Sequence, residues 1–240
     1  MKVVRLAWVL TLALMIMPPT TVAQTLEQLW QQGETAQAQK KYPEAERIWR
    51  QIIQLDPNSA VAFSNLCAAL FRQNKLDEAP IFCQKALALD PKLPETYNNL
   101  GNVLRVQKKL TEAEEMYRRA IELDDKYVRA YNGLGIVLAN QKKLTEAEEM
   151  FRRALALDDK YVFAYIGLGN VLRAQKKLTE AEEMYRRALA LDDKNVYAYN
   201  GLGAVLANQK KLTEAEEMFR RAIALDDKYV GTYYNLGIVL

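Results

Sequence analysis

Residues 141–154 read QKKLTEAEEMFRRA, and nearly the same stretch returns at a fixed interval along the chain. One threonine stands at the same place in every copy, 34 residues from the next. These threonines are Thr111, Thr145, Thr179 and Thr213. A repeat of this length indicates a stacked array, in which each unit buries its apolar face only against its neighbours.

Residues 128–161 form a typical unit, with two stretches of helical spacing. The apolar or small residues are Tyr131, Leu134, Gly135 and Leu138 in the first stretch, and Ala147, Met150, Phe151, Ala154 and Leu155 in the second. Two amphipathic helices joined by the polar turn 141–143 form an antiparallel hairpin. Thr145 and Glu148 fit a capping box, which predicts where the second helix begins.

A glycine recurs at one position of the first helices from Gly101 onward, although glycine costs roughly 1 kcal/mol relative to alanine inside a helix. We expect Gly135 to face Ala147, so that the two helix backbones of the hairpin approach closely. Phe151 would then fill the space beside this contact.

An aromatic residue, then Leu-Gly, then alanine and a second aromatic residue over 34 positions resembles the tetratricopeptide repeat. The resemblance covers about residues 26–240. It implies an all-α fold, a right-handed superhelical solenoid of antiparallel helix hairpins. The repeats are expected at 26–59, 60–93, 94–127, 128–161, 162–195 and 196–229, with a partial repeat at 230–240.

The chain departs from this family at the proline near the end of each repeat. Pro57 and Pro91 match the family, whereas the later repeats have an aspartate, as at Asp159. We expect the turn to survive, because Asp suits helix starts. The partial repeat stops at Leu240 without a polar capping helix, which favours a fragment of a longer chain over an end covered by a partner.

Residues 1–23 do not belong to the repeats and read as a secretory signal peptide. A basic start and a mostly apolar run at 6–17 precede Thr21-Val22-Ala23, a small-residue cleavage site. An uncleaved anchor is the alternative, but this run is short for ~30 Å of hydrocarbon. We therefore expect an exported chain, 24–240, periplasmic or extracellular, with no membrane span after the signal is removed.

Two cysteines stand at linked places of the second repeat. Cys67 takes the glycine position and Cys83 takes the aromatic position of the same hairpin. Because the two positions face each other and the expected compartment is oxidising, we predict a Cys67–Cys83 disulfide. Two buried free thiols are the alternative.

The first repeat has a polar first helix, as expected of a terminal cap whose outer face meets water. Its glutamines are Gln28, Gln31, Gln32, Gln37 and Gln39.

The composition argues against catalysis. The chain has no histidine and two serines, which excludes His-dependent triads and the usual His-containing zinc sites. No phosphate-binding G-x-x-x-x-G-K motif occurs. We predict no enzyme activity, cofactor or metal site. A formal charge of +3, near zero without the signal, leaves no electrostatic footprint for nucleic acid.

The resemblance implies that the first helices line a concave, peptide-binding groove. Asparagine amides both donate and accept hydrogen bonds, so a ladder of them can pair with an extended peptide backbone. The alternative is a solvated polar face. Gly133, Gly167 and Gly201 are expected to leave room for the ligand. The predicted site residues are Asn98, Asn102, Arg105, Asn132, Asn140, Phe163, Asn170, Arg173, Tyr197, Asn200 and Asn208.

These features predict a scaffold that binds a protein or an extended peptide. The alternatives are a targeting arm of a larger enzyme, for example a glycosyltransferase, and a structural spacer of an envelope or secretion assembly. Lysine pairs such as Lys142-Lys143 lie at turns within hairpins and aspartate pairs such as Asp158-Asp159 at turns between them. Opposite charges on the two rims make weak self-association a minor hypothesis.

Overall fold

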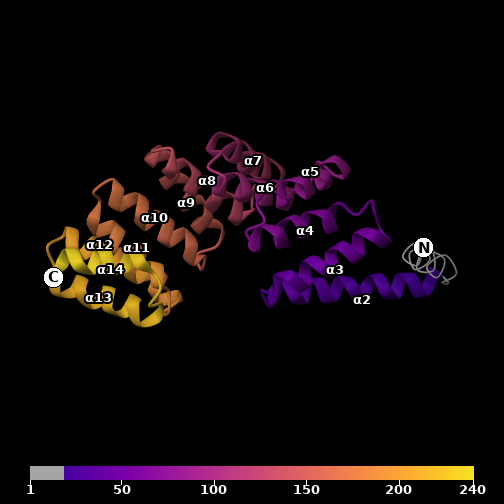
Figure 1. Ribbon diagram of the computed structural model, residues 1–240. Helices are drawn as coiled ribbons and strands as arrows, with labels where there is room; N and C mark the ends of the chain where they lie inside the picture. The colour runs from indigo at the N-terminus through magenta and orange to yellow at the C-terminus, as the bar shows by residue number, and fades with distance from the viewer. Residues whose placement is uncertain (1–18) are drawn as a thin grey trace. The chain divides into compact units, whose positions relative to one another are not determined.

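α-Helices joined by short turns make up the described part of the chain, residues 19–240 of a computed structural model (Figure 1). No strand occurs among these residues, so the predicted all-α fold is confirmed. The helices are α2 (Pro19–Ala38), α3 (Tyr42–Leu55), α4 (Ala60–Arg72), α5 (Ala79–Leu89), α6 (Pro94–Val106), α7 (Leu110–Leu123), α8 (Val128–Asn140), α9 (Leu144–Leu157), α10 (Val162–Ala174), α11 (Leu178–Leu191), α12 (Val196–Asn208), α13 (Leu212–Leu225) and α14 (Val230–Val239). Residues 1–18 of the predicted signal peptide lie outside the described residues, and residues 19–23 belong to α2.

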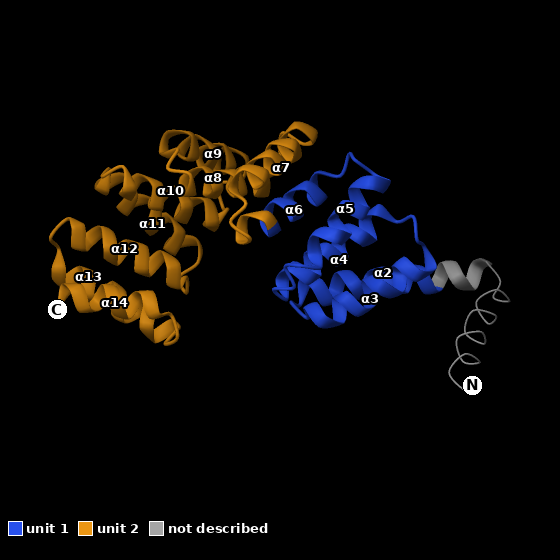
Figure 2. Ribbon diagram, turned by 45° about the horizontal axis from the view of Figure 1, so that its top comes forward, with its two compact units in different colours: residues 1–103 blue, residues 104–240 orange. Residues whose placement is uncertain are grey.

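The chain divides into two compact units, unit 1 up to residue 103 and unit 2 from residue 104 (Figure 2). In unit 1, α2 packs against α3, α3 against α4, and α4 against α5. In unit 2, each helix from α7 to α14 packs against the next. The first helices of its hairpins, α8, α10, α12 and α14, also contact one another in order. Each unit is therefore built of antiparallel helices that follow the order of the chain.

Each turn within a hairpin contains one residue with a left-handed backbone conformation. At Lys142 the φ angle is 66°. The Lys142 and Lys143 N–H groups donate to the carbonyl oxygens of Ala139 (3.0 Å) and Leu138 (2.9 Å), which satisfies the end of α8. The equivalent residues are Lys40, Asn74, Lys108, Lys176 and Lys210. The same turn geometry therefore recurs in every hairpin.

The predicted capping box at the start of the second helix is wrong. α9 begins at Leu144, one residue before Thr145, and Lys143 at its N-cap makes no side-chain cap hydrogen bond. The Glu148 carboxylate instead accepts hydrogen bonds from Arg152 (2.8 Å) and Lys177 (3.0 Å). Ion pairing between repeats thus uses the carboxylate that the capping box needed.

The turn between hairpins survives with Asp159 in place of proline, as expected, but Asp159 does not cap the next helix. The neighbouring Asp158 makes the hydrogen bond inside the turn. Asp158 ends α9, and its Oδ1 accepts from the backbone N–H of Lys160 at 3.0 Å. Tyr161, and not an aspartate, is the N-cap of α10. The turn therefore depends on a side-chain hydrogen bond inside the loop, and not on a helix cap.

A buried aromatic ring joins successive hairpins of unit 2. Phe151 in α9 is 1% exposed. A Cβ atom added at Gly135 of the same hairpin would lie 2.9 Å from its ring, and one at Gly167 of the next hairpin would lie 2.3 Å from it. Tyr185 in α11 has the same relation to glycines in α10 and α12. We call one ring held between glycines of two first helices the aromatic clasp.

The aromatic clasp corrects two expectations. Gly135 lies against the Phe151 ring, and not simply against Ala147. The second set of glycines leaves no room for a ligand, because the ring of the preceding hairpin fills that space. A Cβ at Gly133 would lie 2.4 Å from the Tyr117 ring. Both sets of glycines are therefore required by packing.

In unit 1 a disulfide takes the place of this ring contact. Cys67 in α4 is bonded to Cys83 in α5, and their Cα atoms lie 5.4 Å apart. Both side chains are fully buried. The bond therefore links the two helices of one hairpin at the glycine and aromatic positions of the repeat.

We predict that Gly167→Ala lowers the free energy of unfolding by about 1–3 kcal/mol, because the added methyl group overlaps the enclosed Phe151 ring. This loss of stability is opposite to the usual effect of the substitution, because alanine stabilises a helix interior by roughly 1 kcal/mol relative to glycine. Gly237→Ala in α14 is the matched control, because no atom lies within 4 Å of its added Cβ. Urea unfolding followed by circular dichroism measures both variants. Equal stability of the two would contradict the aromatic clasp.

Candidate functional site

The first helices of unit 2 carry no carboxylate. α8, α10, α12 and α14 contain no Asp or Glu, and their charged side chains are Arg129 and Arg173. Arg105 is the counterpart of Arg173 two repeats earlier, at the start of unit 2. We call the side chains of these four helices that are not buried, together with Arg105, the first-helix face.

Charges on the second helices are largely paired with one another across repeats. Glu148 in α9 binds Arg152 in the same helix and Lys177 at the start of the next second helix. Burial alone would raise the pKa of Glu148, but the hydrogen bonds from Lys177 and Arg152 outweigh it and hold the pKa below its usual value. Glu114 and Glu182 have equivalent partners. These ion pairs connect neighbouring hairpins.

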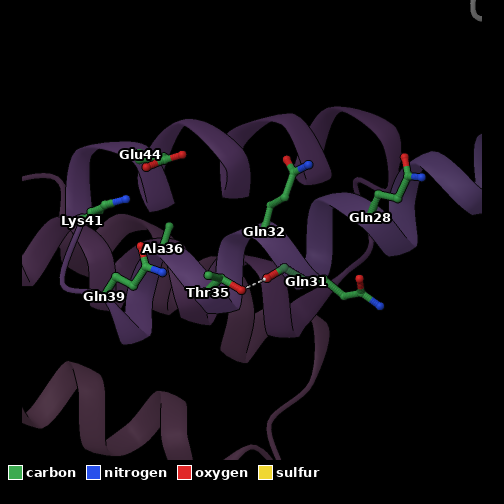
Figure 3. Close-up of a pocket in the computed structure, with 8 residues that line it drawn as sticks. All are labelled: Gln28, Gln31, Gln32, Thr35, Ala36, Gln39, Lys41 and Glu44. Atoms are coloured by element: carbon green, nitrogen blue, oxygen red, sulfur yellow. Dashed lines mark hydrogen bonds between the residues drawn. The ribbon is translucent and has the colours of Figure 1, made fainter.

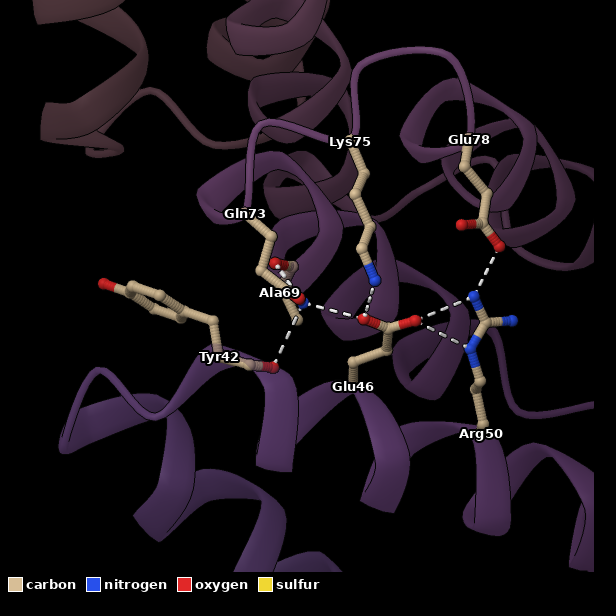
Figure 4. Close-up of polar contacts among 7 residues, drawn as sticks. All are labelled: Tyr42, Glu46, Arg50, Ala69, Gln73, Lys75 and Glu78. Atoms are coloured by element: carbon tan, nitrogen blue, oxygen red, sulfur yellow. Dashed lines mark hydrogen bonds and ion pairs between the residues drawn. The ribbon is translucent and has the colours of Figure 1, made fainter.

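Unit 1 contains the same network between its first two hairpins (Figure 4). The Glu46 carboxylate accepts from Lys75 at 2.6 Å and from Gln73 at 2.8 Å, and it pairs with Arg50 at 3.0 Å. Arg50 also contacts Glu78 of the next hairpin. Lys75 corresponds to Lys143, Lys177 and Lys211, which also pair with a glutamate of the preceding repeat. The predicted basic rim is therefore partly neutralised within the chain.

On the first-helix face, Arg173 is a neighbour of a tyrosine hydroxyl and pairs with no carboxylate of the described residues. The Tyr185 hydroxyl donates to Asn170 Oδ1 at 2.8 Å, and Arg173 interacts with the same hydroxyl. Burial raises the pKa of Tyr185 to about 12, against the opposing effect of Arg173. Arg173 forms no ion pair with any described residue, and its buried Nε has no hydrogen-bond partner there.

Tyr117 and Arg105 repeat the tyrosine and arginine of this arrangement two repeats earlier. Burial raises the pKa of Tyr117 to about 12, and Arg105 opposes the shift. Arg105 Nε is likewise buried without a partner among the described residues. In the repeat between them Phe151 replaces the tyrosine, and Ile136 and Ala139 replace the asparagine and the arginine. The hydroxyl and its polar partners therefore occur together or not at all.

Exposed aromatic rings stand at the N-terminal ends of α10 and α12. Phe163 is 59% exposed and contacts the Tyr161 ring edge-on, with centroids 5.8 Å apart. Tyr197 is 57% exposed and contacts Tyr229 in the same way at 5.4 Å. Exposed aromatic side chains in neighbouring elements are typical of interaction surfaces. Sequence reasoning selected Phe163 and Tyr197 but missed Tyr161 and Tyr229, which precede the helices.

The predicted asparagine ladder is not one exposed row. Asn132 is 9% exposed, and its amide oxygen is buried without a partner among the described residues. Asn200 accepts from Asn235 at 3.0 Å. Asn140 and Asn208 are exposed at the C-terminal ends of α8 and α12. Only part of the predicted set is therefore open to a ligand.

Unit 1 holds the remaining two predicted asparagines. Asn98 is 5% exposed, and Asn102 is partly exposed in α6.

A polar hollow lies between residues of α2 and the start of α3 in the first repeat (Figure 3). The Thr35 hydroxyl donates to the Gln31 carbonyl oxygen at 2.7 Å inside it. Its lining residues are Gln28, Gln31, Gln32, Thr35, Ala36, Gln39, Lys41 and Glu44. Gln37 differs from the predicted outward set, because its Oε1 accepts from the buried Trp49 indole at 3.1 Å.

The described residues, 19–240, contain neither a membrane-spanning helix nor a metal-binding cluster. None of the helices described there is both long and apolar enough to span a membrane. No cluster of three or more Cys, Asp or Glu side chains in that part could hold a metal ion.

The fold defines an array of stacked helix hairpins, and its first helices carry polar and aromatic side chains that are not buried. Models of the tetratricopeptide repeat match residues 29–59, 58–126, 92–160, 127–194 and 166–230. The chain belongs to the tetratricopeptide repeat family. Proteins built on this fold act in general as protein–protein interaction scaffolds.

Solved structures share the fold at low sequence identity. A chain of the APC/C hetero-tetramer Cut9-Hcn1 has a TM-score of 0.82 and 20% identity, over 87% of this chain and 41% of that one. Pseudomonas aeruginosa pilF has a TM-score of 0.75 and 20% identity, over 91% and 99%. YrrB, described as a TPR protein with an unusual peptide-binding site, has a TM-score of 0.57 and 24% identity, over 78% and 96%. The chain thus spans about two fifths of the first of these. No curated protein matches in sequence.

We predict that Tyr117 and Tyr185 make stability fall at high pH. The pKa of each tyrosine is about 10 in the unfolded chain and about 12 in the fold. The folded state therefore keeps its full stability below pH 10 and loses stability as the pH rises from 10 towards 12, because the unfolded tyrosine ionises first. At pH 11 the loss is about 1 kcal/mol per tyrosine. Urea unfolding at pH 8 and pH 11 should show a smaller pH effect in Tyr117→Phe/Tyr185→Phe than in the wild type. Tyr234→Phe, at a 72% exposed residue, is the control and should behave like the wild type.

Proposed function

We propose that this chain is a non-catalytic scaffold that binds a protein or an extended peptide along the first-helix face. The observation that carries the proposal is the contrast between the two sets of helices. The guanidinium groups of the second helices of unit 2 pair with carboxylates, with Arg153 as the exception, whereas Arg105 and Arg173 meet no carboxylate among the described residues. Exposed rings at Phe163 and Tyr197 add apolar contact area to the same face. The concave groove implied by the family resemblance would place these side chains along one ligand.

A non-catalytic role is consistent with the residues that are present. The chain contains no histidine, and its many carboxylates serve in ion pairs such as Glu148 with Arg152. The family supports the same role, because its repeats act in general as scaffolds.

A photo-crosslinking amino acid at Phe163 or Tyr197 tests the proposed face. Incubation with a pool of synthetic peptides of random sequence, followed by irradiation, should give peptide adducts at both positions. Leu157 and Leu191 are matched controls on second helices, exposed by 42% and 44%, and should give few adducts. Adducts measured by mass spectrometry in equal yield at all four positions, or at none, would contradict the proposal.

The scaffold is proposed to work outside the cytoplasm. The basic and apolar start of the chain, with its small-residue site at Thr21-Val22-Ala23, supports export. A fully buried disulfide between Cys67 and Cys83 suits an oxidising compartment.

Mass spectrometry of the exported protein under non-reducing conditions tests this location. We expect an N-terminus at Gln24 and one peptide pair linked through Cys67 and Cys83. Cytoplasmic protein is the control and should keep Met1 and reduced thiols. Met1 on the exported protein would contradict cleavage, and two free thiols there would contradict the oxidising compartment.

A further inference from the structure

Guanidinium groups on the two sets of helices in unit 2 differ in their partners. All second-helix arginines of this unit except Arg153 pair with a glutamate, and those at one position of the repeat do so at 2.7–2.8 Å. The arginines at that position are Arg118, Arg152, Arg186 and Arg220. Arg105 and Arg173 on the first-helix face form no ion pair within the described part of the chain, and each has a buried Nε without a hydrogen-bond partner. A buried polar group without a partner is costly. Both guanidinium groups are therefore left without a carboxylate partner among the described residues.

We propose that the first-helix face recognises an acidic polypeptide segment in extended conformation, through side-chain carboxylates that pair with Arg105 and Arg173. The inference rests on the proposed function and specifies the chemistry of its ligand. A guanidinium group presents a planar fork of donors that fits a carboxylate in a bidentate pair. The absence of Asp and Glu from α8, α10, α12 and α14 leaves no competing carboxylate on those helices.

A buried tyrosine hydroxyl is a neighbour of Arg173. Tyr185 donates its hydroxyl proton to Asn170 Oδ1 at 2.8 Å, so its oxygen lone pairs remain for Arg173. The ring is held by the aromatic clasp, which fixes the position of the hydroxyl. Less conformational freedom is then lost when a carboxylate binds Arg173. Tyr185 is thus a positioning residue, and Arg173 is the residue that contacts the ligand.

The hydroxyl is not required for packing, because the chain uses phenylalanine at the same place in alternate repeats. Phe151 and Phe219 are each 1% exposed, as well buried as the tyrosines. Their repeats have Ile136 and Ala139, or Ala204 and Ala207, in place of the asparagine and arginine. Stability alone therefore does not explain the tyrosine, asparagine and arginine set.

The repeat spacing predicts the spacing of the ligand's carboxylates. Arg105 and Arg173 stand two repeats apart, and neighbouring packed helices lie about 8–10 Å apart. The two guanidinium groups are then about 20 Å from each other. An extended polypeptide spans about 3.3 Å per residue, so the two acidic side chains should lie about six residues apart.

Charge favours a polypeptide over a nucleic acid. Aspartate pairs such as Asp158-Asp159 and Asp192-Asp193 stand just before the starts of α10 and α12. They would repel a continuous phosphate backbone but tolerate two separated carboxylates. The formal charge of +3 over the whole chain is also small for a nucleic-acid-binding protein.

Selection from a random library of twelve-residue peptides with amidated C-termini tests the proposal. Amidation removes the terminal carboxylate, so only side-chain carboxylates can enrich a peptide. We expect enriched peptides to carry two Asp or Glu residues about six positions apart, and their affinity to fall as NaCl rises from 50 to 500 mM. Enrichment of neutral or basic peptides would overturn the acidic ligand and leave the proposed function standing. No enrichment of any peptide, together with no crosslinking at Phe163 and Tyr197, would overturn both.

The matched variant turns one tyrosine repeat into the phenylalanine type that the chain already contains. Asn170→Ile/Arg173→Ala/Tyr185→Phe should keep the fold, because Ile136, Ala139 and Phe151 occupy these positions natively. Fluorescence anisotropy should show at least a tenfold loss of affinity for the enriched acidic peptides. Arg153→Ala, on an exposed second-helix residue, is the control and should bind as the wild type. Unchanged affinity in the triple variant would overturn the proposal.

Tyr185→Phe alone separates positioning from contact. It should weaken binding of the acidic peptide less than Arg173→Ala does, and Arg173→Lys should restore only part of the affinity lost in Arg173→Ala, since a lysine keeps the charge without the fork. Single-stranded DNA of twelve nucleotides is the second probe. DNA binding that is tighter than peptide binding and is lost in Arg173→Ala would overturn the polypeptide ligand.

Discussion

The contact on which the structure depends is one aromatic ring enclosed by two first helices. Phe151 belongs to one hairpin, yet it touches the glycine of its own first helix and the glycine of the next. A buried aromatic side chain removes about 150–250 Å² from water, a large part of what a small hairpin can bury. Neither hairpin can enclose the ring alone. Packing between repeats is therefore needed for each repeat to have a core.

The same contact connects the fold with the candidate site. Where the ring is a tyrosine, as at Tyr185, its hydroxyl reaches Asn170 and Arg173 on the first-helix face. The second helices use their charges differently, because Glu148 and its counterparts join one hairpin to the next. One set of helices thus joins the hairpins through ion pairs, and we propose that the other presents polar groups to a partner.

Much of the fold could be predicted from the period of the sequence, because helical spacing and a short polar turn leave few arrangements for each repeat. The starts of the second helices could not be predicted in this way. Thr145 and Glu148 match a capping box, but a carboxylate that binds Arg152 and Lys177 cannot also cap the helix. The glycines were misread for a related reason. Gly167 contacts the ring of a preceding repeat, and a local pattern does not show that contact.

The sequence by itself determined that the chain is helical, how long each repeat is and which residues could lie on the first helices. It also showed that tyrosine and phenylalanine alternate in step with Asn170, Arg173 and their counterparts. Only the tertiary structure decided what this alternation means, because Tyr185 and Asn170 are on different helices and meet only when the hairpin closes. Burial, which sets the pKa of Tyr185 and leaves Arg173 Nε without a partner, is a property of packed neighbours and not of any one segment.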